Sequence, residues 1–199
     1  MTAIRQSPLF RAHERSGASF VDHHGWRVPS HFTDARQEAE QLAKAVVVVD
    51  ATWVVKLDLK NAAPELSGAR AWCLGRNHYL VTCDPSERDS VLKQLDSASA
   101  YVTDVTSVYA QFLLAGPRSR DLLRKLTSLN VGTLANLACG QASVAHVAAK
   151  VLREDLAEVP AFHILVGREY GESVWEAILH AGHEFHILPA GLRALGGRA

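Results

Sequence analysis

The strongest constraint on the fold is a run of four valines, residues 46–49, that ends at Asp50. β-branched side chains favour extended backbone. The longest apolar stretch around the run, residues 43–55, is interrupted by Lys44 and Asp50. It is also shorter than the ~20 apolar residues that a membrane-spanning helix needs. The sequence therefore predicts a long buried strand over residues 46–59 and no membrane span.

The second half of this strand alternates between apolar and charged residues, as expected for a strand with one buried face. The apolar members are Val55, Leu57 and Leu59, and the charged members are Lys56, Asp58 and Lys60. Similar patterns predict strands over residues 71–74, 78–83, 101–105, 108–114, 143–152 and 161–166, and helices over 33–45, after Asp84, after Pro117 and over 168–182.

Strands and helices follow one another without a regular alternation, which favours an α+β fold over a doubly wound parallel sheet. A chain of 199 residues is long enough for one domain with a real core. We expect two small sheet-plus-helix halves, about residues 1–100 and 101–199, joined near residues 97–106.

Two helix starts carry recognisable capping residues. Thr33 is the expected N-cap of the helix over residues 33–45. Asp84 is followed by Pro85 and, three residues on, by Glu87, which together predict a capped helix start. For Asp84 this structural role is favoured over contact with a ligand.

The helix over residues 168–182 has more apolar surface than one core stripe needs. Trp175 and Leu179 lie four residues apart and widen its apolar face. We expect this flank to pack under the segment over residues 186–195 rather than to contact another chain.

Charge and cysteine content limit the functional classes. Lys+Arg and Asp+Glu both number 21, and no block of like charges occurs, so a nucleic-acid or acidic-membrane surface is not expected. Residues 1–10 contain no apolar core typical of a signal peptide. Cys73, Cys83 and Cys139 are odd in number and lack CxxC spacing, which favours reduced, mostly buried thiols and a soluble, cytoplasmic protein.

Two groups of histidines are candidates for metal ligands. The three-residue spacing of His180, His183 and His186 suits chelation, but no carboxylate or cysteine completes the set cleanly. His23 and His24, with His31 nearby, are interpreted as turn surface that lacks the acidic company of a metal site. No metal site is predicted, and no Ser/His/Asp or Cys/His order indicates nucleophilic catalysis.

The beginning of the chain resembles the glycine-cleavage aminomethyltransferase (T-protein) family. That family opens with a small residue followed by Pro-Leu, a histidine-bearing helix, Gly-Ala, and Gly-Trp, which is separated from a proline by two residues. The matching residues here are Ser7-Pro8-Leu9, His13, Gly17-Ala18, Gly25-Trp26 and Pro29.

The back half is similar to another member of that superfamily, the small γ subunit of heterotetrameric sarcosine oxidase. The similar segments are GARAWCLGRNHYLV, TDVTSVYAQFLLAGPRSRDLLRKL and PAFHILVGREYGESVWEAILHAGHEF. The resemblance implies an aminomethyltransferase-type folate-binding fold, truncated relative to the full-length T-protein, which has a further C-terminal domain.

The resemblance also implies a loss of catalysis. T-proteins transfer a one-carbon unit from lipoyl-protein to tetrahydrofolate and use an aspartate between the first long strand and a Trp-Leu-Gly hairpin. This chain passes from Leu59 to Trp72 through a short loop that contains Glu65 and no aspartate. No catalytic residue is therefore assigned.

By correspondence, the folate-binding candidates are Trp53, Val54, Asp84, His163 and Arg193. His163 occupies the position of the glutamate that binds the pterin edge in the family. Leu195 takes the place of a family arginine, which Arg193 would have to replace. A histidine accepts one hydrogen bond where a carboxylate accepts two, so tetrahydrofolate would be bound weakly.

Three functional hypotheses remain at this stage. The first is a non-catalytic accessory subunit that binds a reduced folate and works with a large amine-oxidase-type subunit. The second is an active aminomethyltransferase whose base is Asp50 or Asp58. The third is a structural or regulatory module without a ligand. The gene neighbourhood would distinguish the first two: sarcosine-oxidase-type genes favour the accessory subunit, and lipoyl-carrier genes favour the enzyme.

Overall fold

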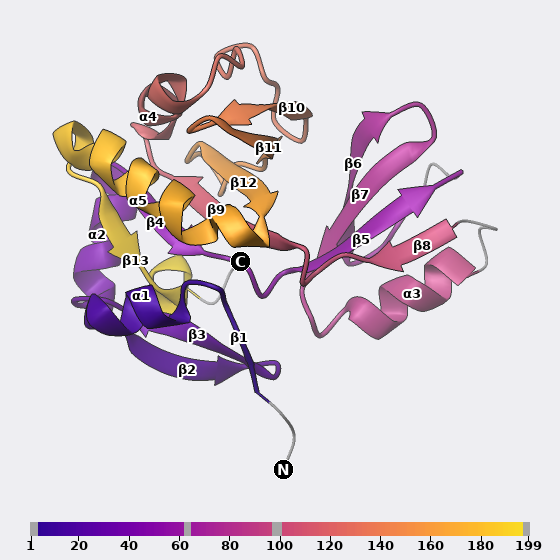
Figure 1. The fold of residues 1–199 in the computed structure, drawn as a ribbon, viewed down its shortest axis with the longest axis horizontal. Helices are drawn as coiled ribbons and strands as arrows, with labels where there is room; N and C mark the ends of the chain where they lie inside the picture. Colours follow the sequence, from indigo (N-terminus) through magenta and orange to yellow (C-terminus); the bar gives the residue numbers. More distant parts are fainter. Residues whose placement is uncertain (1–3, 62–64, 97–100, 197–199) are drawn as a thin grey trace.

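The computed structural model describes residues 4–61, 65–96 and 101–196. A six-stranded sheet forms the centre of its larger part (Figure 1), with the strand order β10-β11-β12-β9-β4-β13. In that order the strands are Cys139–Val144, Val147–Arg153, Ala161–Gly167, Tyr109–Ala115, Val47–Asp50 and Leu188–Ala190. Neighbouring strands are antiparallel except β13, which is parallel to β4.

Alternation along the central strands divides the core between two faces of this sheet. On one face, Phe112 of β9 and Phe162 of β12 pack in the same cluster as residues of α4 (Ser119–Leu126) and α5 (Gly171–Gly182). Three shorter helices contact α5 on this face. They are α1 (Phe10–Arg15) and the single-turn helices η1 (Arg168–Tyr170) and η2 (His183–Phe185). These elements bury the apolar stripe of α5.

The opposite face of β4 and β9 packs against a second set of elements. These are α2 (Ala35–Lys44), the single-turn helix η3 (Leu192–Leu195), and a three-stranded sheet of order β1-β3-β2, formed by Arg5–Gln6, Trp26–His31 and Ser19–His23. The buried Glu38 carboxylate joins them, since it accepts hydrogen bonds from the backbone N–H groups of Phe32, Thr33 and Gly191.

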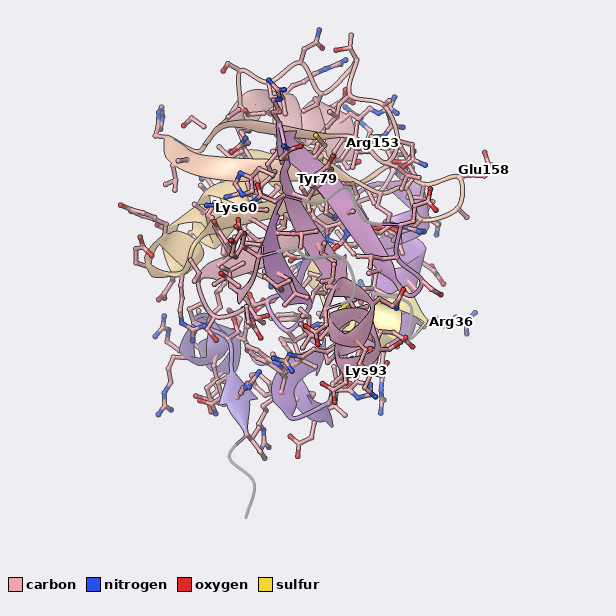
Figure 2. All side chains as sticks on the ribbon, turned by 90° about the vertical axis from the view of Figure 1, so that its right-hand side faces the viewer. Arg36, Lys60, Tyr79, Lys93, Arg153 and Glu158 are labelled. Carbon is pink, nitrogen blue, oxygen red and sulfur yellow. The ribbon has the colours of Figure 1, made fainter. Side chains whose placement is uncertain are left out.

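A four-stranded antiparallel sheet of order β6-β7-β5-β8 forms the smaller part of the molecule (Figures 1 and 2). Its strands are Ala69–Gly75, His78–Cys83, Val55–Lys60 and Tyr101–Asp104. One face packs on α3 (Arg88–Asp96). From the other face, Trp72 and Leu80 pack against Leu152 and Leu165 of the central sheet, so the two sheets share a core contact.

The predicted α+β class is confirmed, but two predicted strands are wrong. Residues 46–59 form two strands, because the backbone N–H of Thr52 bonds to the Asp50 side chain and the chain turns from one sheet into the other. Residues 143–152 span most of a hairpin, β10–β11, which turns at Ala145 and His146, both with positive φ.

The two sheet-plus-helix units do not follow a division of the chain at residue 100. Strand β4 pairs with β9, and β5 pairs with β8, so each sheet takes strands from both sides of that point. Residues 97–100 of the expected junction lie outside the described residues. The smaller unit is therefore formed by a segment, residues 55–104, that is inserted between β4 and β9 of the central sheet.

Local signals placed the helix starts to within a few residues. Asp34, not Thr33, caps α2, and its side chain accepts a hydrogen bond from the N–H of Arg36. The Asp84 carboxylate accepts one from the N–H of Ser86, and α3 begins at Arg88, one turn further on. Within the described ranges, no helix has the length and apolar content required to cross a membrane.

Trp175 is buried within the chain, as expected, and three aromatic rings pack around it. Its ring lies 4.9 Å from that of His13, 6.3 Å from that of Phe32 and 5.7 Å from that of Phe112. These rings come from α1, the residue after β3, and β9, and Ile187 of the predicted cover packs against the same cluster. The amino-terminal segment is therefore held against α5 through this ring.

We expect Trp175→Ala to lower the free energy of unfolding by about 3–5 kcal/mol, because a 4% exposed indole is removed from the core. Urea denaturation measures the loss, and Trp175→Phe, which keeps an aromatic ring, should lose less. An unchanged denaturation midpoint in Trp175→Ala would show that the ring is not packed in this way.

Candidate functional site

A cavity of about 670 Å³ lies where the two larger sheets meet. Its size is within the range of small-molecule sites. The apolar part of the wall comes from α2, the β4–β5 turn, the segment before β6, β9 and η3, and includes Leu42, Val54, Leu66, Leu113 and Leu195. The loop after β11 closes one side through residues 154–157 and Val159, while Glu158 projects away from the body (Figure 2).

Two polar side chains project into the cavity from the centre of the sheet. On β9 and β12, Phe112 and Phe162 face the helices, so the two-residue period turns Gln111 and His163 the other way. The Gln111 amide and His163 Nδ1 are hydrogen-bonded at 3.0 Å. Among the described residues, no partner is found for the buried Gln111 Oε1.

The His163 ring is neutral near pH 7. Burial lowers its pKa to about 4, and the nearby Lys56 adds to this effect while Glu154 opposes it. With the Gln111 amide donating to Nδ1, the ring proton is on Nε2. The pair then offers a ligand one N–H donor, whereas the unpartnered Gln111 Oε1 is buried and would accept a hydrogen bond only after the side chain turned toward the ligand.

Two of the three carboxylates on the cavity wall are paired with arginines. Glu154 Oε1 lies 2.8 Å from Arg70 Nε, and Asp155 Oδ2 lies 2.6 Å from Arg153 Nη2. Burial raises the pKa of Asp155, but Arg153 and the N–H of Ala161 more than offset this and lower it. A general base works best with a pKa near the operating pH, so Asp155 is poorly suited to that role.

Asp84 and Cys83 follow each other at the end of β7 and both line the cavity. Asp84 Oδ1 already accepts hydrogen bonds from the N–H and hydroxyl of Ser86. Burial, followed by Asp84, raises the pKa of the Cys83 thiol to about 11. The thiol is therefore protonated at neutral pH and is not an activated nucleophile. Cys73, expected with the buried thiols, is exposed.

The wall at Val54 is positioned by buried polar groups in the β4–β5 turn. Lys56 Nζ is fully buried and donates to the carbonyls of Thr52 (2.9 Å) and Val54 (2.7 Å). Burial lowers the pKa of Lys56 to about 7, although Asp50 and Asp104 raise it. These bonds hold the turn that carries the chain between the sheets.

The sequence candidates separate into two groups. Val54, Asp84 and His163 line the same cavity. Trp53 is buried beside His23, with ring centroids 4.5 Å apart, and Arg193 is exposed on η3; neither lines the cavity. Leu195 lines it instead, which places an apolar group where the family resemblance predicts an arginine.

Neither aspartate considered as an alternative base is on the cavity wall. Asp50 is buried on the other side of β4, where its Oδ2 lies 3.0 Å from Nε2 of His13. Burial raises the pKa of Asp50, but His13, Ser7 and Thr52 lower it overall. Asp58 lies 2.7 Å from His78 on the β5–β7 pair.

Sequence reasoning missed Gln111 and the two arginine–carboxylate pairs. A single amide in the apolar strand sequence YAQFLLA was a usable signal for Gln111. Arg70 and Glu154 are distant in the chain, so no local pattern marks that pair, whereas Arg153 and Asp155 are only two residues apart.

His24 is exposed in a turn, as expected, but the interpretation that His23 and His24 lack acidic company is wrong. Asp84 lies beside both of them, although it is 60 residues away in the chain. By contrast, His180, His183 and His186 are exposed and form no metal-ligand group within the described part of the chain.

Comparison with known proteins identifies the family. The sequence profile of the GCVT N-terminal domain matches residues 68–198. The chain therefore belongs to the GCVT N-terminal domain family.

Curated relatives include the aminomethyltransferases of Saccharopolyspora erythraea, 26% identical, and Halothermothrix orenii, 23% identical. Each alignment covers 96% of this chain, but only 62% and 63% of the respective relative. The chain thus spans less than two thirds of the length of these enzymes.

Two solved structures share the fold. Glycine cleavage system aminomethyltransferase T from Bartonella henselae matches with a TM-score of 0.79 and 14% identity, over 97% of this chain and 61% of that one. A chain of heterotetrameric sarcosine oxidase from Corynebacterium sp. U-96 matches with a TM-score of 0.63 and 17% identity, over 91% of this chain and 96% of that one. The predicted aminomethyltransferase-type fold is confirmed.

We expect the free energy of unfolding to rise between about pH 7 and pH 9, by on the order of 1 kcal/mol per pH unit. The unfolded Lys56 side chain, with an ordinary pKa of 10.5, keeps a proton that the folded lysine releases above about pH 7. Urea denaturation across this range measures the slope, which Lys56→Met should reduce whatever its absolute stability. Equal slopes in the two proteins would mean that Lys56 stays charged in the fold.

Proposed function

We propose that the chain is a non-catalytic subunit that binds a reduced folate in the cavity between its sheets. The main support is the His163–Gln111 pair, which places a donor and an unpaired, buried acceptor at the wall of a largely apolar cavity of suitable volume. A pterin ring is flat, with hydrogen-bonding groups on its edges, so these residues fit it: Gln111 Oε1 would accept from an edge N–H, and Val54 and Leu113 would pack on the ring.

The same cavity supports the absence of catalysis. A carboxylate that accepts a proton in one-carbon transfer must be free and close to the folate. Here Glu154 and Asp155 are paired with arginines, and Asp84 is hydrogen-bonded to Ser86. In addition, the alignment with the Saccharopolyspora erythraea enzyme runs over 227 positions, more than the 199 residues of this chain. That enzyme therefore has internal residues without a counterpart here, in keeping with a lost catalytic segment.

The proposed partner is a large amine-oxidase-type subunit. Support comes from the sarcosine oxidase chain, which this chain matches over nearly the full length of both. Sarcosine-oxidase-type genes beside the gene for this chain would favour that partner, and lipoyl-carrier genes would favour an active aminomethyltransferase.

We expect no aminomethyl transfer by the purified chain. With tetrahydrofolate and the aminomethylated lipoyl carrier, ammonia should be released no faster than without protein, while a full-length aminomethyltransferase serves as the positive control. Release well above the blank would overturn the non-catalytic proposal and favour the enzyme alternative.

Folate affinity should be weak and should improve when the carboxylate is restored. A charged hydrogen bond contributes roughly 1.5–3 kcal/mol, and ~1.4 kcal/mol corresponds to tenfold in affinity. His163→Glu should therefore bind tetrahydrofolate at least about tenfold more tightly in calorimetry. His146→Glu, which makes the same charge change in the exposed β10–β11 turn, is the matched control.

The outcomes separate the hypotheses. Sub-micromolar binding by the wild-type chain, or an equal gain in both variants, would mean that the site is wrongly placed. No binding by wild type or His163→Glu would favour the structural module without a ligand.

A further inference from the structure

The turn of the β2–β3 hairpin brings two adjacent histidines together. Its central residues, His24 and Gly25, have φ values of 46° and 80°, the pattern of a type I′ turn. Successive side chains of a regular strand point to opposite faces. The left-handed backbone at His24 changes this, and the rings of His23 and His24 lie 4.5 Å apart.

A carboxylate from the smaller unit faces these two rings. Asp84 Oδ2 lies 3.8 Å from Nε2 of His23, and Asp84 Oδ1 lies 3.8 Å from Nε2 of His24. One potential ligand atom from each of the three residues lies within 4.8 Å of the others. The two hydrogen bonds from Ser86 fix the orientation of the carboxylate through Oδ1. Three donor atoms from two distant segments thus converge on one point.

The His23 nitrogen that faces Asp84 is buried and makes no hydrogen bond within the described part of the chain. Its ring is held edge-on against the buried Trp53, with centroids 4.5 Å apart. A buried ring nitrogen with no partner loses its interaction with water without compensation. A cation bound between the three residues would remove this deficit, and the half-exposed His24 leaves the site open to solvent.

We propose that His23, His24 and Asp84 bind a divalent transition-metal ion of the zinc type. Two imidazoles and one carboxylate are a common zinc-ligand set, in which the fourth position is held by water or another ligand. Imidazole nitrogen disfavours Mg²⁺ and Ca²⁺, which select oxygen ligands.

Zinc–ligand bonds of about 2.0–2.2 Å require the three atoms to approach to roughly 3.3 Å from one another. Small side-chain movements, mainly of the half-exposed His24, would supply this contraction while Ser86 holds Asp84. The bound ion would join the β2–β3 hairpin to the end of β7, and so would link the larger and smaller parts of the molecule (Figure 1).

The test uses a substitution that removes a ligand and suits the turn. His24→Asn creates Asn-Gly, the dipeptide most favoured in a type I′ turn, so the variant should fold. His146→Asn is the matched control, because His146 is also exposed in a hairpin turn with positive φ, 67°, but lies outside the cluster. Each protein is stripped with a chelator, dialysed, and titrated with ZnCl₂ by calorimetry, and its thermal midpoint is measured with and without zinc.

The wild type and His146→Asn should bind one zinc ion per chain and show a raised thermal midpoint, because zinc binds the folded form. His24→Asn should bind at least tenfold more weakly and show a smaller rise. The proposal is overturned if the wild type binds no zinc, or if His24→Asn binds zinc as tightly as the wild type does.

Discussion

The structure depends on a buried polar turn that carries the chain from the central sheet into the smaller one. Asp50 ends β4, accepts a hydrogen bond from Thr52 and is paired with His13. Lys56 begins the next sheet and holds the carbonyls of Thr52 and Val54. A buried ammonium group is costly unless its N–H groups are bonded, so the turn is restricted to a conformation that supplies those carbonyls. The cavity wall at Val54 is a direct consequence.

The same turn separates two chemical environments. On the helix side of the central sheet, the His13–Asp50 pair lies against the rings of Phe32 and Trp175 and does not line the cavity between the sheets. On the other side, His163 and Gln111 face an open volume, and the nearby charges are arranged in ion pairs. The second side can therefore recognise a polar, flat ligand, but the carboxylates of Glu154 and Asp155 on it are both paired with arginines.

Local patterns predicted much of the fold but little of the site. Alternation correctly placed Val55, Leu57 and Leu59 on one face, and the valine run marked a buried strand. The break at Asp50 was missed because it depends on a hydrogen bond from the Thr52 N–H to the Asp50 side chain. It also depends on Lys56, which the alternating pattern predicts to be on the surface but which is fully buried. No local sequence pattern indicates the proximity of Asp84 to His23 either, because it arises only when a hairpin and the end of another strand meet in space.

The most direct test of the ligand site is a ¹H–¹⁵N NMR titration of the labelled chain with a stable reduced folate, 5-formyltetrahydrofolate. The account predicts the largest shifts at the Gln111 side-chain amide and at the backbone amides of Val54, Leu113 and Leu195, with little change at Trp175 on the opposite side of the central sheet. Saturable shifts confined to another surface, or no shifts at millimolar folate, would contradict it.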